Sequence, residues 1–204
     1  DHGSLDISKL TEVTTTFNQL HPTLVLNCAA YTKVDLCETD GRQTAWHVNA
    51  EGPGYLADCA MKAGAVIVHF STDFVFDGTA SRPYVETDTP NPRGTYAASK
   101  LLGEWFAADA ARAYVLRVES LFGSVRGARP AKGSVASILK AIQSGSEARV
   151  FEDRTISPAY VFDVAVAPRK LVEMSAAPGL YHCVNSGSCT WLELAREIGR
   201  QLDV

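Results

Sequence analysis

Two short segments of this chain carry side chains that together could deliver a proton. FSTDFVFDG, at residues 70–78, reads as the end of a buried strand and presents Thr72 and Asp73. YAASK opens a predicted helix and places Tyr96 and Lys100 four residues apart, so that both lie on one helix face. A hydroxyl, a phenol and an ammonium that meet in this way suit protonation of a carbonyl oxygen while hydride reaches the carbon.

The chain around these segments alternates between predicted helices and predicted strands. TLVLNCAA and AVIVHFST are continuous apolar runs, which is typical of strands buried on both faces. The alternation predicts a parallel sheet with helices on both faces. The expected elements are a helix over 10–20, a strand over 23–30, helical structure over 37–62 with a break at 52–54, and then a strand over 65–72, a helix over 96–111 and a strand over 113–123.

After Gly123 the pattern changes, and residues 124–204 read as a smaller lobe that follows a core formed by residues 1–123. The lobe begins with a basic, glycine-bearing loop, and a capping box at Thr190 and Glu193 predicts the start of a final helix. Its other expected elements are a helix over 134–143, a short strand over 149–152, a helix over 160–174 kinked at Pro168 and a strand over 179–185.

Composition narrows the class of protein. The chain has 204 residues, a net charge of −4 and no basic cluster, so nucleic acid is not an expected partner. Its apolar runs are only as long as strands, which predicts no membrane span, and its first residues lack the pattern of a signal peptide. The five cysteines form no CxxC pair. That pattern indicates reduced thiols in a cytoplasmic protein and gives no support to a metal site.

A dinucleotide-binding fold needs a glycine-rich turn after its first strand. None of the fifteen glycines forms GxGxxG or GxxGxxG, and the chain begins without Met. We therefore expect a chain truncated at both ends, with the first βαβ unit upstream of Asp1. A complete domain that binds no dinucleotide is the alternative, although three buried parallel strands would make an unusually small sheet.

Seven segments in order give the chain a resemblance to the extended short-chain dehydrogenases/reductases, and within them to the dTDP-4-dehydrorhamnose reductase family. The resemblance implies an α/β fold with a Rossmann-like doubly wound parallel sheet and a small C-terminal α/β substrate lobe. The segments are NCAAYTKVDLCE (27–38), HVNAEG (47–52), HFSTDFVFDG (69–78), YAASKLLGE (96–104), LRVESLFG (116–123), EDRTISPAYVFDVA (152–165) and GLYHCVNSGSCTWLELAREI (179–198).

In a protein that resembles this family, Tyr96 is the expected general acid and Thr72 is expected to hold the same carbonyl oxygen. A free phenol has a pKa near 10, and a nearby cation lowers that value, so Lys100 is expected to bring the pKa of Tyr96 closer to neutral. The resemblance also implies that Lys100 binds the nicotinamide ribose. It makes Asp73 and Ser120 the expected substrate contacts.

The cofactor is expected along the ends of the first elements. Ala29, Ala30 and Tyr31 close the first predicted strand, where small residues let a cofactor approach the backbone, although tight helix packing would explain them as well. Asp6 and Ile7 match the family's segment beside the adenine, and a helix N-cap is the alternative for Asp6. Other polar residues are given structural roles: Asn49 is expected to bond backbone, and Glu38, Glu104 and Glu193 to lie on solvated helix faces.

Two positions depart from the family pattern. Ser120 stands where the family usually carries a Trp that packs on the sugar, and Arg154 replaces the Gln of a DQxGSPT motif. Both changes leave the identity of the sugar open, whereas neither touches the hydride chemistry.

The sequence therefore predicts a reductase that uses NADP(H) or NAD(H) on a nucleotide-linked 4-keto-6-deoxy sugar. Its expected partners are the nucleotide sugar and, as an open question, a second copy of the chain. Two alternatives stay open. One is a non-catalytic regulatory subunit of the methionine adenosyltransferase type, which shares this fold. The other is an epimerase or dehydratase of the same superfamily, although Phe74 follows Asp73 where dehydratases usually carry Glu.

Overall fold

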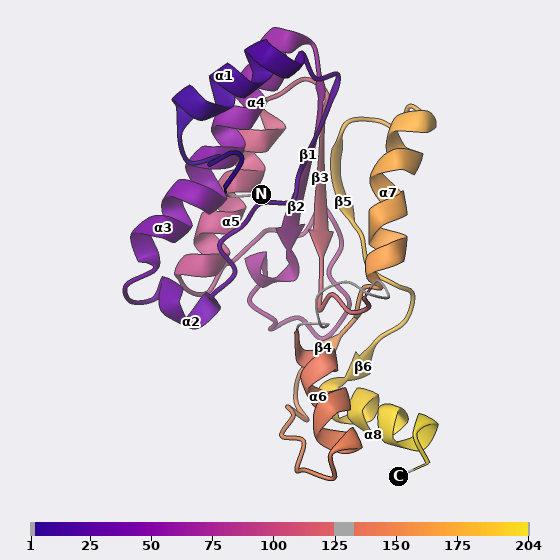
Figure 1. Cartoon of the computed structure of the whole chain (residues 1–204). Coiled ribbons are helices and arrows are strands. Elements are labelled where there is room, and N and C mark those ends of the chain that lie inside the picture. Colours follow the sequence, from indigo (N-terminus) through magenta and orange to yellow (C-terminus); the bar gives the residue numbers. More distant parts are fainter. Residues whose placement is uncertain (1–2, 125–132, 204) are drawn as a thin grey trace. The chain divides into compact units, whose positions relative to one another are not determined.

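The computed structural model describes residues 3–124 and 133–203, and the chain divides into two compact units (Figure 1). The first unit comprises Asp1–Arg117 and Ser175–His182, and the second comprises Val118–Met174 and Cys183–Val204. The expected boundary at residue 123 thus differs from the observed division. The reason is that residues 179–182, which were assigned to the second lobe, form a strand that pairs with the sheet of the first unit.

The first unit is built on one sheet with the strand order β1-β2-β3-β5. β1 pairs with β2 in parallel and β3 pairs with β5 in parallel, as the alternation of helices and strands predicts. The four strands are β1 (Leu24–Asn27), β2 (Val66–Thr72), β3 (Ala113–Val118) and β5 (Gly179–His182).

β2 and β3 are buried almost throughout, but β1 is not. Leu24 is 40% exposed and Leu26 is 51% exposed, so the prediction that this strand is buried on both faces is wrong. β1 stands at the end of the strand order, and an end strand has a neighbour on one side only.

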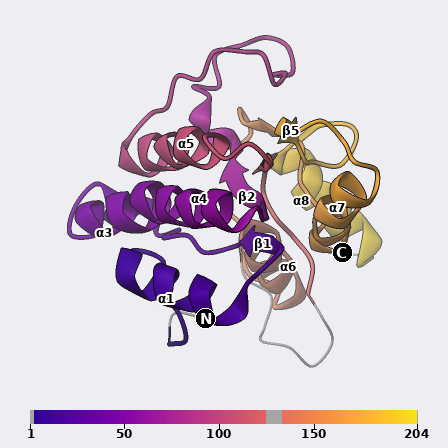
Figure 2. The same cartoon turned by 90° about the horizontal axis from the view of Figure 1, so that it is seen from above.

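Helices α1, α4 and α5 lie side by side (Figure 2). Val13 and Phe17 of α1 pack with Leu56 of α4 and Ile67 of β2 in one buried cluster, which is the core of the first unit. The helical elements of this unit are α1 (Leu10–Leu20), α2 (Val34–Cys37), α3 (Arg42–Trp46), the π-helical turn η1 (His47–Glu51), α4 (Gly52–Ala63), the 3-10 turn η2 (Asp73–Val75) and α5 (Thr95–Ala108).

The expected helix break at residues 52–54 does not occur. The chain passes from η1 directly into α4, and Pro53 sits in the first turn of α4, where a residue without an N–H is tolerated. The break was predicted from the Gly-Pro-Gly sequence, whereas the observed departure from α-helical geometry is the π-helical turn just before it.

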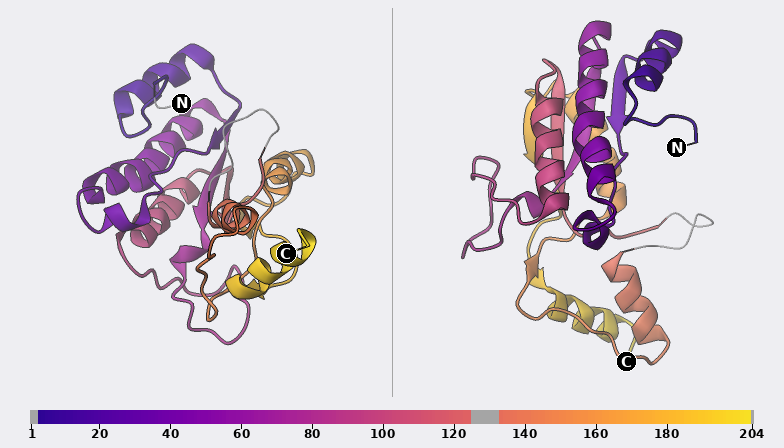
Figure 3. Two further views of the ribbon diagram at one scale, coloured as in Figure 1. Left: turned by 60° about the horizontal axis from the view of Figure 1, so that its bottom comes forward. Right: turned by 90° about the vertical axis from the view of Figure 1, so that its left-hand side faces the viewer.

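The second unit contains α6 (Ser134–Gln143), α7 (Val161–Glu173) and α8 (Trp191–Gln201), and α6 and α8 contact each other (Figure 3). β4 (Thr155–Ile156) pairs antiparallel with β6 (Cys189–Thr190). The short strand therefore lies at 155–156, and its prediction at 149–152 is wrong. Most of the predicted basic loop, residues 125–132, lies outside the described residues.

Two sequence predictions for the second unit are confirmed. α6 has the expected bounds, and the capping box of α8 is present, with the Thr190 hydroxyl accepting from the Glu193 N–H at 3.1 Å. Pro168 lies inside α7.

Within residues 3–124 and 133–203, no helix is both long enough and apolar enough to cross a bilayer.

Gly103 allows α5 to approach η1 at backbone distance. A Cβ at this position would lie 2.0 Å from the carbonyl oxygen of Asn49, which cannot move without shifting the helix turn. We therefore expect Gly103→Ala to lower the free energy of unfolding by about 1–3 kcal/mol, the usual cost of overpacking, as measured by urea denaturation.

The matched control is Gly54→Ala on α4. There an added Cβ would meet Phe106 at 3.4 Å, an ordinary contact, so we expect no loss and a gain of up to about 1 kcal/mol from helix propensity. Equal effects of the two substitutions would contradict the close approach at Gly103.

Candidate functional site

The candidate site begins where β2 ends. Thr72 is the last residue of β2 and caps the turn η2, and its hydroxyl accepts from the Phe74 N–H at 3.2 Å and donates to Oδ1 of Asp73 at 3.0 Å. These two bonds fix the hydroxyl at the carboxyl end of a parallel strand, the edge where open α/β sheets bind ligands.

Tyr96 and Lys100 lie in the first turns of α5, whose start is fixed from a distant part of the chain. Oε1 of Glu38 accepts from the Thr95 N–H at 2.5 Å and Oε2 accepts from the Thr95 hydroxyl at 3.1 Å. A carboxylate is favoured at a helix N-terminus. The prediction that Glu38 lies on a solvated helix face therefore missed its role as the cap of α5, which no local signal reveals.

Lys100 is buried beneath this edge of the sheet. Lys100 is 2% exposed, and its Nζ donates to the carbonyl oxygen of Phe70 at 2.6 Å. Burial lowers the pKa of Lys100 to about 8, because removal from water penalises the charged form, and the nearby carboxylate of Glu104 partly opposes this.

Tyr96 is brought together with Thr72, but its titration differs from the prediction. Burial raises the pKa of Tyr96 above its ordinary value, the Thr72 hydroxyl opposes the rise, and the charges of Asp73 and Cys37 add to it. The expectation that the pKa of Tyr96 lies closer to neutral is therefore wrong for this structure, because desolvation of the phenol dominates. The Phe74 ring packs edge-on against Tyr96 with 5.7 Å between ring centres.

Asn49 ties the end of β1 to the helix that carries Tyr96. Its Oδ1 accepts from the Tyr31 N–H at 2.7 Å, and its Nδ2 donates to the Tyr31 carbonyl at 3.0 Å and to the Ser99 hydroxyl at 3.1 Å. Ser99 in turn donates to the Tyr96 carbonyl at 2.8 Å. The expected backbone-bonding role of Asn49 is confirmed, and the bonds hold the Tyr31 segment against α5.

The two residues just before Tyr31 are partly open to solvent. Ala29 is exposed and Ala30 is half-buried, so tight packing under a helix does not account for Ala29. The Ala29 N–H donates to Oδ1 of Asn27 at 3.2 Å, which shapes the turn after β1.

Asp6 and Ile7 lie in the turn before α1. Oδ1 of Asp6 accepts from the N–H and the hydroxyl of Ser8 at 3.1 and 2.7 Å. The N-cap position of α1 is Lys9, so the alternative that Asp6 caps this helix is wrong. Ile7 is buried in the core, where it contacts Gly52.

Ser120 belongs to the second unit, where its backbone is left-handed with φ 43°. Its neighbour Glu119 accepts from the Ser157 N–H at 2.7 Å. The other departure from the family pattern, Arg154, places its guanidinium 4.5 Å from the centre of the Phe151 ring. The substrate role of Ser120 stays a prediction.

Glu104 is a further correction, because it is buried and not on a solvated helix face. It forms a two-pronged ion pair with Arg117, with N–O distances of 2.9 and 2.7 Å. The sequence shows Glu104 one turn after Lys100, but its partner lies on another element.

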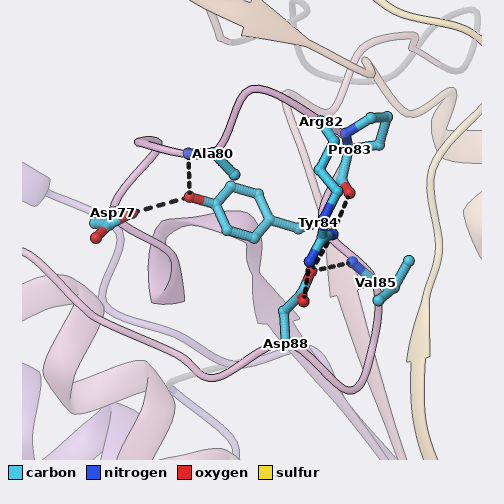
Figure 4. A network of polar contacts seen from close by, with 7 residues as sticks. All are labelled: Asp77, Ala80, Arg82, Pro83, Tyr84, Val85 and Asp88. Carbon is cyan, nitrogen blue, oxygen red and sulfur yellow. Dashed lines mark hydrogen bonds and ion pairs between the residues drawn. The ribbon is translucent and has the colours of Figure 1, made fainter.

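A shallow, open cavity of about 510 Å³ lies in the loop that joins η2 to α5, away from Thr72, Tyr96 and Lys100. Its polar groups satisfy one another (Figure 4): Tyr84 donates to Oδ1 of Asp77 at 2.9 Å, and Arg82 donates to both oxygens of Asp88 at 2.8 and 2.6 Å. We assign no ligand to it.

Among residues 3–124 and 133–203, no group of three or more His, Cys, Asp or Glu side chains could hold a metal ion.

The parallel sheet, with Thr72 at a strand end and Tyr96 and Lys100 on the following helix, is the arrangement of a Rossmann-type α/β domain. Residues 1–204 match the model of a family described as "RmlD substrate binding domain". The chain belongs to this family.

Relatives and solved structures agree with that assignment. The chain is 35% identical over 195 residues to the spore coat polysaccharide biosynthesis protein SpsK of Bacillus subtilis, covering 95% of the chain and 66% of SpsK. It is 37% identical over 183 residues to dTDP-4-dehydrorhamnose reductase of Mycobacterium tuberculosis, covering 87% and 59%. The crystal structure of dTDP-4-dehydrorhamnose reductase of Bacillus anthracis in complex with NADP superposes with a TM-score of 0.90 at 33% identity, covering 100% of this chain and 71% of that one. The chain thus spans about two thirds of the length of these proteins.

The buried position of Lys100 predicts a specific pH dependence of stability in the absence of cofactor. Between about pH 8 and 10.5 the unfolded chain keeps a proton that folded Lys100 has lost, so the stability of the parent rises with pH relative to Lys100→Met. We expect the stability advantage of the Met variant to shrink by up to roughly 3 kcal/mol across this range, as measured by urea denaturation at several pH values.

Lys62→Met, at an exposed position of α4, is the matched control for loss of a lysine. A stability difference between the parent and Lys100→Met that stays constant from pH 7 to pH 10.5 would contradict the assigned effect of burial.

Proposed function

We propose that this chain forms part of a reductase that uses NADPH or NADH to reduce a nucleotide-linked 4-keto-6-deoxy sugar, such as dTDP-4-dehydrorhamnose. The observation that carries the proposal is the meeting of the Thr72 hydroxyl and the Tyr96 phenol at the end of β2, with Lys100 buried one turn further along α5. Relatives named as reductases of dTDP-linked sugars support the same reading.

The proposed chemistry is protonation of the carbonyl oxygen during hydride transfer. A bound reduced nicotinamide supplies the hydride. The Thr72 hydroxyl turns its proton from Asp73 to the carbonyl oxygen, and Tyr96 gives that oxygen a proton. Burial keeps the phenol of Tyr96 protonated at neutral pH, and donation of its proton requires that the pKa fall toward neutral as cofactor and substrate bind. Lys100 lies one helical turn away and favours the phenolate that remains after transfer.

The proposed cofactor contacts lie along the same edge of the sheet. Ala29, Ala30 and Tyr31 would border the cofactor, with Asp6 and Ile7 beside its adenine and Lys100 at the nicotinamide ribose. Exposure of Ala29 and the anchoring of Tyr31 by Asn49 support a preformed surface there. The NADP complex of the Bacillus anthracis reductase supports the choice of a nicotinamide cofactor.

Asp73 and Ser120 are the proposed substrate contacts, and the nucleotide sugar is the proposed partner. We also propose that the protein is a cytoplasmic member of the extended short-chain dehydrogenases/reductases that binds no nucleic acid. A second copy of the chain is the other proposed partner. A solved neighbour of this fold, the Bordetella bronchiseptica enzyme WbmG, contains NAD and UDP.

The proposal is tested by Tyr96→Phe in the complete gene product. Loss of the phenolic proton should lower turnover by roughly 10²–10⁴-fold, the usual contribution of general acid catalysis, as measured by oxidation of reduced nicotinamide with a dTDP-4-keto sugar. Tyr55→Phe on α4, which removes the hydroxyl that donates to Glu51 of η1, is the control and should leave turnover unchanged.

Undiminished turnover of the Tyr96→Phe variant would remove Tyr96 from the mechanism. A parent protein with no reductase activity that co-purifies with a methionine adenosyltransferase would favour the regulatory-subunit alternative.

A further inference from the structure

Arg117, near the carboxyl end of β3, joins two elements that carry the candidate site. Its Nε and Nη2 donate to the two carboxylate oxygens of Glu104 at 2.9 and 2.7 Å. Its guanidinium carbon lies 4.9 Å from the centre of the Phe76 ring. Both charged side chains are 5% exposed, so the pair is shielded from water.

The two contacts of Arg117 connect different parts of the site. Glu104 follows Lys100 by one turn of α5, the helix that also carries Tyr96. Phe76 is the residue at which the turn η2 ends, and that turn begins directly after Thr72. One guanidinium therefore contacts both the helix that carries the phenol and the turn that follows the hydroxyl.

The stacking of Phe76 extends this connection into the loop that follows. The Phe76 ring stacks on Tyr84 with 4.2 Å between ring centres and an interplanar angle of 11°. Tyr84 is held in turn by its hydrogen bond to Asp77. A displacement of Arg117 would therefore shift η2 and the start of the loop that follows it.

Stability alone explains this pair poorly. Two charges lose their hydration on burial, and apolar side chains of similar volume often replace a buried ion pair without loss of stability. In addition, Nη1 of Arg117 is buried and has no hydrogen-bond partner in the part of the chain that the structure describes. An apolar pair could not reproduce the geometry of the Arg117 guanidinium, which forms two parallel hydrogen bonds to Glu104 and also lies over the Phe76 ring.

We propose that Arg117 is a positioning residue for the reduction. Its two hydrogen bonds to Glu104 hold α5, and its contact with the Phe76 ring holds η2. Tyr96 and Thr72 are thereby positioned to contact the same carbonyl oxygen. This inference rests on the proposed function. Arg117 itself touches none of the reacting atoms and acts through Glu104 and Phe76.

The decisive experiment replaces both partners, as Glu104→Met with Arg117→Met, in the complete gene product. We expect the midpoint of urea unfolding to stay near that of the parent, because the two charges of the pair are removed together and Lys100 keeps its hydrogen bond to the Phe70 carbonyl. We expect kcat to fall roughly 10- to 100-fold, the cost of a misplaced reacting group, with the KM for reduced nicotinamide unchanged. If the pair served stability alone, a stable double variant would keep the kcat of the parent, and that result would overturn the inference.

Arg117→Lys is the second variant, because it keeps the charge and loses both the fork and the flat stack. We expect a folded protein with a reduced kcat, and full activity of this variant would likewise refute the positioning role. Arg200→Lys is the matched control: its exposed two-pronged pair with Glu197 lies on α8, outside the network of Arg117, so kcat should not change.

The two proposals fail in different ways. A parent protein that reduces no 4-keto sugar would refute the proposed function. A parent that does so, beside a fully active double variant, would refute only the role of Arg117.

Discussion

The burial of one face of α5 against the sheet is the constraint on which the candidate site depends. Lys100 gives up its hydration on this face and donates to the Phe70 carbonyl of β2, and Glu104 lies on the same helix in its pair with Arg117 of β3. Each charge is accepted in the interior because a partner on the sheet receives it. These partners also fix the rotation and height of α5, and with them the position of Tyr96.

Hydrogen bonds from the other elements add to this placement. Glu38 binds the first turn of α5, and Asn49 reaches the same helix through Ser99. Gly103 removes the side chain that would keep α5 away from η1. The start of α5 is thus held by Glu38 at the end of α2, its middle by Asn49 of η1, and its buried face by the sheet. A site of defined geometry requires this kind of rigid support.

The sequence predicted those features that arise from local periodicity. The apolar runs identified β2 and β3, helical spacing identified α1, and the capping box identified the start of α8. The same runs did not reveal that β1 is half-exposed, because the order of strands in a sheet is not contained in the pattern of any one strand. The pairs Glu38–Thr95 and Glu104–Arg117 were missed for a related reason: each carboxylate reads as an ordinary helix-surface residue until the distant partner is placed beside it.

The titration of the site shows how a motif can name the right residues and still mislead on their physics. Spacing places Lys100 one turn from Tyr96, and charge alone would lower the pKa of the phenol. Burial acts on both groups at once, and in opposite directions: it raises the pKa of Tyr96 and lowers that of Lys100, since each group is driven toward its neutral form. A lysine with a pKa of about 8 still carries its charge at neutral pH. The desolvation that makes this face of α5 costly to bury therefore also sets the protonation states of its two titratable groups.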